Sequence, residues 1–157
     1  MNEVLNKVTI LPYAPELAIY FKQLNIEWIQ KYFTVEEHDT EQLDNPEEYI
    51  ISKGGYILFA EHNNEIVATC ALIKTGEKEF ELAKMAVAAG LQGKQIGKTL
   101  GLAVLELAKQ QGAKRLWLES NRILQPAINL YIKLGFIEIP ITATPYARAD
   151  IRMEMWL

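Results

Sequence analysis

Cysteine and histidine are nearly absent from this chain, and their scarcity limits the chemistry it can carry. Cys70 is the only cysteine among 157 residues, so neither an intramolecular disulfide nor a site of several thiolates can form. It lies in the apolar run IVATCALI, and we interpret it as a buried structural thiol. The two histidines, His38 and His62, are expected in surface loops, and no third histidine exists to complete a metal site. The sequence therefore predicts no resident metal.

Long apolar runs and an excess of positive charge are missing as well. No run approaches the roughly 18 apolar residues of a membrane span, and the N-terminal sequence MNEVLNKVTI lacks the pattern of a signal peptide. We therefore expect a cytoplasmic protein that does not act on a membrane. The 20 acidic residues outnumber the 16 basic ones, and no basic block occurs. Because nucleic-acid binding depends on Lys and Arg that neutralise phosphates, this balance argues against a nucleic-acid partner.

What the chain does contain is an ordinary globular composition, half hydrophobic and 23% charged, with alternating strand-like and helix-like segments. The asparagines in His62–Glu65 predict a hairpin turn. Thr34, with Glu37 three residues later, predicts the capping box of a second helix. The expected strands are 8–11, 56–60, 66–74, 80–87, 115–119, 136–139 and 151–156, and the other expected helices are 15–32, 96–111 and 126–134.

This order of elements, β-α-α-β-β-β-α-β-α-β-β, predicts one α+β (α/β) domain over residues 1–157. We expect a mixed, mostly antiparallel sheet with helices on both faces. No repeat, linker or low-complexity segment divides the chain.

The segment Phe80–Leu100 joins an apolar run to an amphipathic helix through a glycine-bearing turn. A helix N-terminus presents unpaired N–H groups and the positive end of its dipole, so Gly93 and Gly97 would let a phosphate approach the backbone. Lys94 and Lys98 add positive charge. Two common phosphate motifs do not fit, because the dinucleotide fingerprint needs GxGxxG after a first strand and a P-loop needs GxxxxGK[ST].

Within this turn, the residues Gln92-Gly93-Lys94-Gln95-Ile96-Gly97 resemble the acyl-CoA signature Gln/Arg-x-x-Gly-x-Gly/Ala of the GCN5-related N-acetyltransferase (GNAT) superfamily. A second block, Pro126-Ala-Ile-Asn-Leu-Tyr-Ile-Lys-Leu-Gly-Phe136, is similar to that family's A-x-x-L-Y-x-K-x-G-F segment. The resemblance implies the GNAT fold over most of the chain. It also implies transfer of the acetyl group of acetyl-CoA to an amine, carried by a small molecule or a protein, and it is compatible with a homodimer.

The resemblance further implies roles for residues in a cleft between the family's fourth and fifth strands. Tyr131, the tyrosine of the L-Y pair, would protonate the departing thiolate. Glu81 or Glu119 would accept the proton of the amine, directly or through water. A backbone N–H near Met85 or Val87 would stabilise the developing oxyanion. The implied cofactor-binding residues are Met85, Ala86, Val87, Gln92, Gly93, Lys94, Gln95, Ile96, Gly97, Lys98 and Asn121.

The acceptor would enter beside the first two helices and the loop before the last strand. Aromatic and acidic side chains there would suit a cationic amine, although helical aromatics also serve as ordinary core. Arg148 would either bind a carboxylate of the acceptor through two hydrogen bonds or pair with Asp150. The expected acceptor-binding residues are Trp28, Tyr32, Phe33, Tyr146 and Arg148, with Glu36, Glu37 and Asp39 nearby.

Residue types alone leave other interpretations open. Tyr131 could be a half-buried helical aromatic, the two glutamates solvated strand-end charges, and Asn121 a loop residue that stabilises its own turn. Gln95 stands where the family most often has its middle glycine, and a side chain there would crowd the pyrophosphate. The alternative function is therefore a non-catalytic module that keeps the fold and binds acyl-CoA or a partner protein.

Overall fold

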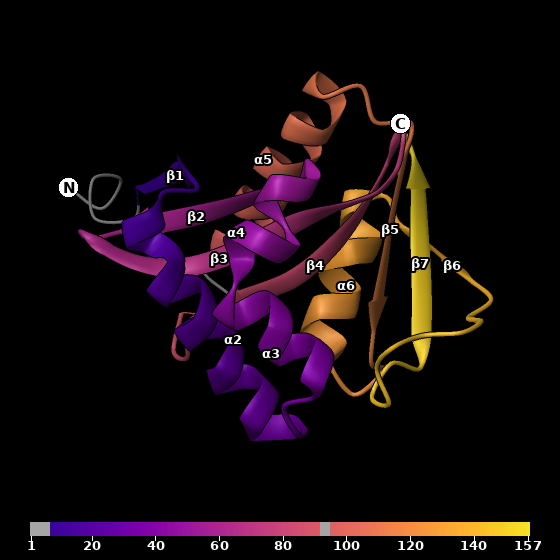
Figure 1. Ribbon diagram of the computed structural model, residues 1–157, viewed down its shortest axis with the longest axis horizontal. Coiled ribbons are helices and arrows are strands. Elements are labelled where there is room, and N and C mark those ends of the chain that lie inside the picture. The colour runs from indigo at the N-terminus through magenta and orange to yellow at the C-terminus, as the bar shows by residue number, and fades with distance from the viewer. Residues whose placement is uncertain (1–6, 92–94) are drawn as a thin grey trace.

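A computed structural model describes residues 7–91 and 95–157 (Figure 1). Its centre is a seven-stranded sheet in the order β1-β2-β3-β4-β5-β7-β6. Neighbouring strands are antiparallel except β4 and β5, which run parallel. The strands are β1 (Val8–Pro12), β2 (Tyr56–His62), β3 (Glu65–Gly76), β4 (Glu79–Val87), β5 (Arg115–Ser120), β6 (Ile137–Ile139) and β7 (Ile151–Trp156).

Helices cover both faces of this sheet, as the sequence predicted. The α2–α4 side carries its own core, with Phe21, Ile29 and Leu43 packed against β2 and β3. The opposite side carries a larger core, in which residues of α5 and α6 pack on the sheet. The helices are α2 (Ala18–Tyr32), α3 (Glu37–Asp44), α4 (Pro46–Tyr49), α5 (Ile96–Gln110) and α6 (Gln125–Leu134), with short 3₁₀ turns η1 (Pro15–Leu17) and η2 (Ile51–Lys53).

The local sequence explains most element ends. Asn63 and Asn64 adopt left-handed φ values of 51° and 63°, which is the backbone of a type I′ turn and confirms the predicted hairpin between β2 and β3. Gly135, with a φ of 113°, ends α6 in the same left-handed region. Gly101 of α5 faces Leu134 of α6 so closely that a Cβ there would lie 2.8 Å from Leu134 Cδ1. The two helices therefore depend on a residue without a side chain at this position.

The predicted capping box was placed in the wrong frame. Helix α3 begins after Glu36, whose N–H donates to Asp39 Oδ2 at 2.9 Å, and Thr34 does not cap it. An acidic pair can form the same reciprocal cap as Ser/Thr with Glu. Asp39 is also drawn to this position by partners on β4 and on the loop before β7, described below. The turns α4 and η2 were not predicted.

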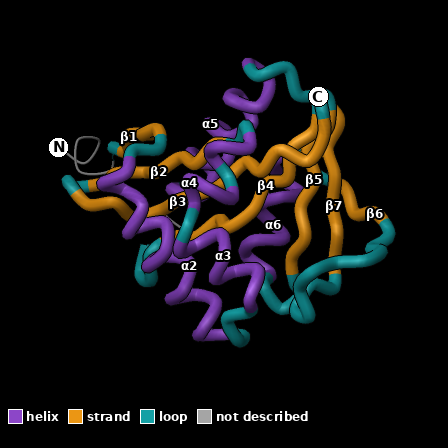
Figure 2. The backbone as a smooth tube through the Cα atoms, in the orientation of Figure 1, coloured by secondary structure: helices purple, strands orange, loops and turns teal. Residues whose placement is uncertain are grey.

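The strands β4 and β5 pair over only three positions. Glu79, Phe80 and Glu81 pair with Arg115, Leu116 and Trp117, after which the two strands diverge. Figure 1 shows them together near the end marked C and separated away from it. Residues 140–150 form the long connection between β6 and β7 (Figure 2). Within the described part of the chain, no helix has the length and apolar character needed to cross a membrane.

Candidate active site

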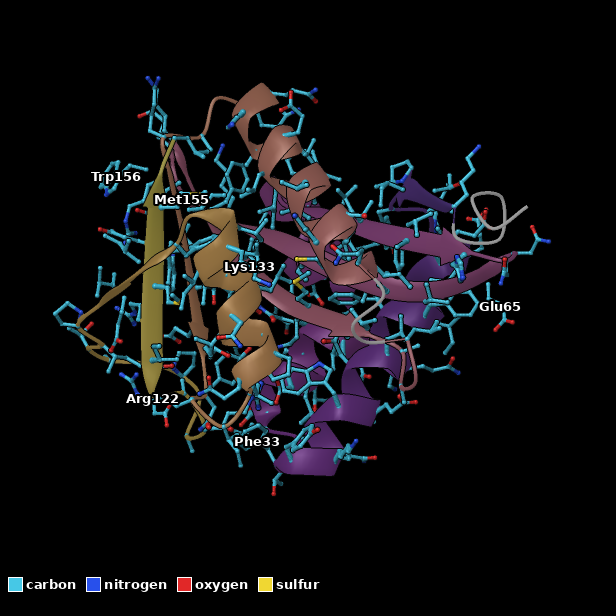
Figure 3. All side chains as sticks on the ribbon, turned by 180° about the vertical axis from the view of Figure 1, so that it is seen from behind. Phe33, Glu65, Arg122, Lys133, Met155 and Trp156 are labelled. Carbon is cyan, nitrogen blue, oxygen red and sulfur yellow. The ribbon has the colours of Figure 1, made fainter. Side chains whose placement is uncertain are left out.

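A cleft of about 570 Å³ opens where β4 and β5 separate. Its walls come from β4, the end of β5, α6, the first turn of α5, the C-terminal end of α2 and the loop before β7. Figure 3 labels two of the lining residues from behind, Lys133 on α6 and Phe33 at the end of α2. The structure brings these predicted residues together around it: Trp28, Tyr32, Phe33, Glu81, Met85, Ala86, Val87, Gln95, Gly97, Lys98, Glu119, Asn121, Tyr131, Tyr146 and Arg148.

One predicted residue that the structure describes, Ile96, is not among the side chains that line the cleft. Ile96 is 2% exposed and packs in the core under α5, so only its backbone can serve a ligand. Gln92, Gly93 and Lys94 lie outside the described residues. The signature turn is therefore seen from Gln95 onward.

A bulge in β4 at Lys84 shapes one wall of the cleft. Lys84 has a left-handed φ of 54°, and it and Met85 together stand opposite the single residue Cys70 of β3. A bulge inserts one extra residue into a strand and so reverses the alternation of side chains that follow it. The flanking pairs that define it are Thr69 with Ala86 and Ala71 with Ala83.

This reversal decides which side chains reach which face. Leu82, before the bulge, packs into the core on the α5 side. After the bulge Met85 and Val87 lie on that side, where both come within 4 Å of a Cβ built on Gly97. Lys84 points to the other face, and its Nζ lies 2.8 Å from Asp39 Oδ1 of α3. Two sides of the cleft are thus set by one inserted residue.

The edge of β4 beyond the bulge offers backbone donors to the cleft. The N–H of Ala88 donates to Val67 O of β3 at 2.8 Å. Because N–H groups alternate in direction along a strand, that of Val87 points the other way, toward the side from which β5 has withdrawn. Val87 is therefore the better placed of the two predicted oxyanion donors, since Met85 lies within the bulge.

Glu81 combines burial with a negative neighbour. Burial is the main cause that raises its pKa from 4.5 to about 7, and the charge of Glu119 raises it further. Lys84 and Arg152 act in the opposite direction, and no hydrogen bond from the described residues contributes. A carboxylate with such a pKa exchanges protons near neutrality, which is what a general base requires.

Glu119, the alternative base, is already engaged by protein groups. Its Oε2 accepts a hydrogen bond from Arg152 Nε at 3.0 Å, and its Oε1 accepts one from the Thr144 hydroxyl at 2.6 Å. Both oxygens are thus occupied. Glu119 acts on the cleft mainly through its charge, which helps to raise the pKa of Glu81.

Tyr131 projects from α6 and is 8% exposed. Its ring packs edge-on against Phe136, with centroids 6.1 Å apart. Burial, with a smaller contribution from Cys70, raises the pKa of the phenol far above its ordinary value of 10.0. The hydroxyl therefore stays protonated at neutral pH, which is the state that a general acid needs.

The first turn of α5 supplies the anion site. Gln95 has a left-handed φ of 67° and stands at the N-cap, and its carbonyl accepts the Thr99 N–H at 3.0 Å. The N–H groups of Ile96, Gly97 and Lys98 precede this first intrahelical bond and have no helical partner. Gly97 and Lys98 border the cleft. These donors, the helix dipole and the Lys98 ammonium suit a phosphate group.

A buried charge cluster closes the acceptor end of the cleft. Asp39 is 0% exposed, and Arg148 binds it through both terminal nitrogens, Nη1 to Oδ2 at 2.7 Å and Nη2 to Oδ1 at 2.6 Å. Lys84 Nζ contacts the same carboxylate and donates to the Tyr146 hydroxyl at 2.7 Å. Burial raises the pKa of Asp39, but these two cations outweigh it and lower the pKa to about 2. Asp39 is therefore a structural counter-ion.

These contacts correct two expectations. Arg148 pairs with Asp39 and not with Asp150, which instead accepts the N–H of Arg122 at 2.9 Å. The acidic residue at position 39 does not offer a free charge to a cationic amine, because it is buried and neutralised. Sequence reasoning also missed Lys84, although a lysine inside the apolar strand ELAKMAV was an available signal, since a buried lysine needs a partner.

Asn121 serves the loop that it belongs to. Its Nδ2 donates to Arg148 O at 2.7 Å, and its Oδ1 accepts the N–H of Ile123 at 2.9 Å. The side chain borders the cleft with one remaining N–H. Its main effect is to tie the end of β5 to the loop that carries Arg148.

Comparison with known proteins agrees with this geometry. The family model described as the acetyltransferase (GNAT) family matches residues 22–136. YjgM of Escherichia coli (strain K12), described as an uncharacterized N-acetyltransferase, is 29% identical over 161 residues that cover 97% of this chain and 93% of YjgM.

Two solved structures share the fold. A GNAT-family acetyltransferase of Staphylococcus aureus Mu50 has a TM-score of 0.83 at 22% identity, covering 94% of this chain and 98% of its own. The Salmonella typhimurium protein yncA, solved with its cofactor acetyl-CoA, has a TM-score of 0.75 at 16% identity, covering 95% of this chain and 93% of its own. The resemblance carried by the two sequence blocks is confirmed, and the chain belongs to the GNAT acetyltransferase family.

Proposed function

We propose that this protein transfers the acetyl group of acetyl-CoA to an amine by direct attack. The observation that carries the proposal is the meeting of Glu81 and Tyr131 in one cleft, one a carboxyl group with a pKa of about 7 and the other a phenol that stays protonated. A base and an acid with such different pKa values match the two proton transfers that amide formation from a thioester requires.

The described residues fit acetyl-CoA, the cofactor of the family. The free N–H groups at the start of α5 and the Lys98 ammonium would hold its pyrophosphate, and the open edge of β4 at Val87 would hydrogen-bond its pantetheine arm or the thioester oxygen. When bound, acetyl-CoA supplies a thioester as the acetyl donor. Gln95 adopts the left-handed backbone that a glycine would take at this position, and it borders the cleft.

The protein groups then divide the proton work. Glu81 takes a proton from the ammonium of the acceptor, directly or through water, and is about half ionised near pH 7. The Tyr131 hydroxyl gives its proton to the sulfur that leaves. The neighbouring Glu119 raises the pKa of Glu81 and so makes Glu81 a stronger base. Trp28, Tyr32 and Phe33 would shield the reacting amine from water.

The test begins with a calorimetric titration of acetyl-CoA into the purified protein, with NADH as the control ligand. We expect micromolar binding of acetyl-CoA and none of NADH. Release of thiol is then followed with a panel of amines for the wild type, Tyr131→Phe and the matched control Tyr56→Phe, which changes a tyrosine that packs on Phe80 away from the cleft. Tyr131→Phe should lower kcat by about 100-fold and leave acetyl-CoA binding unchanged.

Three outcomes would contradict parts of the proposal. An unchanged kcat in Tyr131→Phe removes the acid from the mechanism. Tight binding of acetyl-CoA without transfer to any amine favours the alternative, a binding module that keeps the fold. Absence of acetyl-CoA binding refutes the cofactor site itself. The cytoplasmic location and the homodimer remain predictions.

A further inference from the structure

Arg148 uses only part of its hydrogen-bonding capacity among the described residues. A guanidinium has five N–H donors. Its Nη1 donates one hydrogen bond to Asp39 and one to Glu36 Oε2 at 3.4 Å, and its Nη2 donates one to Asp39. The N–H of Nε and the second N–H of Nη2 remain, and they lie side by side on the edge of the guanidinium next to the one that binds Asp39. This edge is a complete fork for one carboxylate.

The unused Nε donor of Arg148 is not sealed inside the protein. No buried side-chain nitrogen or oxygen among the described residues lacks a hydrogen-bond partner, so an Nε without one is in contact with solvent. Arg148 borders the cleft, and its side chain is 11% exposed.

The guanidinium is also held in a fixed position. Its carbon lies 4.5 Å from the centre of the Tyr146 ring and 5.7 Å from that of Trp28, and Asp39 fixes the edge next to the unused one. A fork that is already immobile loses little entropy when a ligand binds.

The carboxylates in and around the cleft are not free to bind a second cationic group of the acceptor. Asp39 is buried and bound by two cations, and Glu119 is bound by Arg152 and Thr144. Glu36 accepts the Ala147 N–H at 3.0 Å through one oxygen and contacts Arg148 through the other. Glu81 alone keeps a free carboxyl group, and its raised pKa suits proton removal better than lasting ion pairing. Asp39 and Glu36 already balance the charges of Lys84 and Arg148, so what Arg148 offers a ligand is its unused N–H donors.

We propose that the acceptor is an amine that also carries a carboxylate, which binds the Nε–Nη2 edge of Arg148 while the amine lies at Glu81. The proposal rests on the proposed acetyltransferase function and names its substrate class. The reaction is the same: the amine nitrogen forms a bond to the acetyl carbon, the carbon–sulfur bond breaks, and the sulfur takes the proton of Tyr131. The carboxylate takes no part in bond making. The aromatic residues Trp28 and Phe33 would contact the body of the acceptor.

The experiment compares each acid with its own carboxamide. L-phenylalanine and β-alanine, with their carboxamides, are assayed for thiol release from acetyl-CoA, so that both a short and a longer spacing between amine and carboxylate are covered. A charge-assisted fork should favour the acid of at least one pair by about tenfold or more in kcat/KM. The comparison is conservative, because an α-carboxamide has the more readily deprotonated amine.

Variants then assign the preference to Arg148. Arg148→Gln should abolish it, because Asp39 keeps Lys84 as its counter-ion and the fold retains a balanced pair. Arg148→Lys keeps the charge but not the fork, and should retain only part of the preference. The control is Arg115→Lys, an arginine paired with Glu79 and Glu154 away from the cleft, which should leave the preference unchanged. Thermal unfolding shows whether each variant is folded.

The outcomes separate this proposal from the proposed function. Equal kcat/KM for acid and carboxamide in both pairs, or a preference that survives Arg148→Gln, overturns the carboxylate site while acetyl transfer stands. If none of the four amines reacts, the same acids and carboxamides are titrated calorimetrically into protein saturated with CoA. The acids should then bind and the carboxamides should not; any other result overturns the proposal. Failure of acetyl-CoA itself to bind contradicts the proposed function first.

Discussion

Replacement of Glu81 by Gln should make the protein more stable at alkaline pH, and the size of the gain follows from the buried carboxyl group. In the unfolded chain Glu81 ionises with a pKa near 4.5, whereas in the fold its pKa is about 7. Between these values the native state holds a proton that the unfolded state has lost, so the free energy of unfolding falls as pH rises through this window. Above pH 7 the fold bears the full cost of ionising Glu81.

The difference of 2.5 pKa units corresponds to about 3 kcal/mol at 1.36 kcal/mol per unit. Glutamine cannot ionise, so its effect on stability does not follow this titration. Between about pH 5 and pH 8.5 the variant should therefore gain about 2–3 kcal/mol relative to the wild type. The variant should also lose the rise of kcat/KM with pH that has its midpoint near 7, because the base is gone.

Urea unfolding of both proteins at the two pH values measures this gain directly. The matched control is Glu65→Gln at the exposed end of the β2–β3 hairpin (Figure 3), far from the cleft, and its stability relative to the wild type should not change with pH. A relative change below about 1 kcal/mol for Glu81→Gln would refute the burial argument. It would also remove the reason for assigning Glu81, rather than water, as the base.

Three further substitutions test the parts around the cleft. Gln95→Gly should stabilise the protein by about 1 kcal/mol, because glycine adopts the left-handed φ of 67° without strain, and calorimetry should show acetyl-CoA binding at least as tight. Gly101→Ala should cost about 1–3 kcal/mol in urea unfolding, since its Cβ would lie 2.8 Å from Leu134 Cδ1; a neutral result would mean that the Leu134 side chain moves aside without cost. Asp39→Asn should cost about 3 kcal/mol or more at neutral pH, because the buried Lys84 loses its counter-ion and Arg148 loses its two-bond partner. The Asp39→Asn loss should shrink as pH falls from 3.8 toward 2, where the native carboxylate itself becomes protonated. A loss independent of pH would contradict the assigned pKa.

The sequence predicted the strands and long helices to within a few residues because their signals are local. Period-two and three-to-four spacing, paired asparagines and Gly135 each act within a few positions, and the structure reproduces them. The frame of α3 was missed for the opposite reason. Asp39 serves the cap of its own helix and also binds Arg148, 109 positions away, and no local pattern reports the second demand.

The residues of the candidate site also fall into some that the sequence predicts and some that it does not. The residues that the family blocks identify, such as Tyr131 and Gly97, do border the cleft. Glu81 and Glu119 looked alike as strand-end acids, and only their environments separate them, since Glu81 has no donor among the described residues and Glu119 is held by Arg152 and Thr144. Sequence can name two carboxylates, but it cannot predict which of them a distant arginine will occupy.

The bulge at Lys84 is the step that connects the strand to the acceptor end of the site. No glycine marks it, yet a regular β4 would direct Lys84 toward the apolar core beside α5, where its charge would have no partner. The extra residue turns the lysine to α3 and brings Asp39 under it. Asp39 then fixes Arg148, and with it the loop before β7, so that Arg148 borders the cleft with part of its N–H donors unused. A backbone irregularity in one strand thereby sets the charge that an acceptor meets.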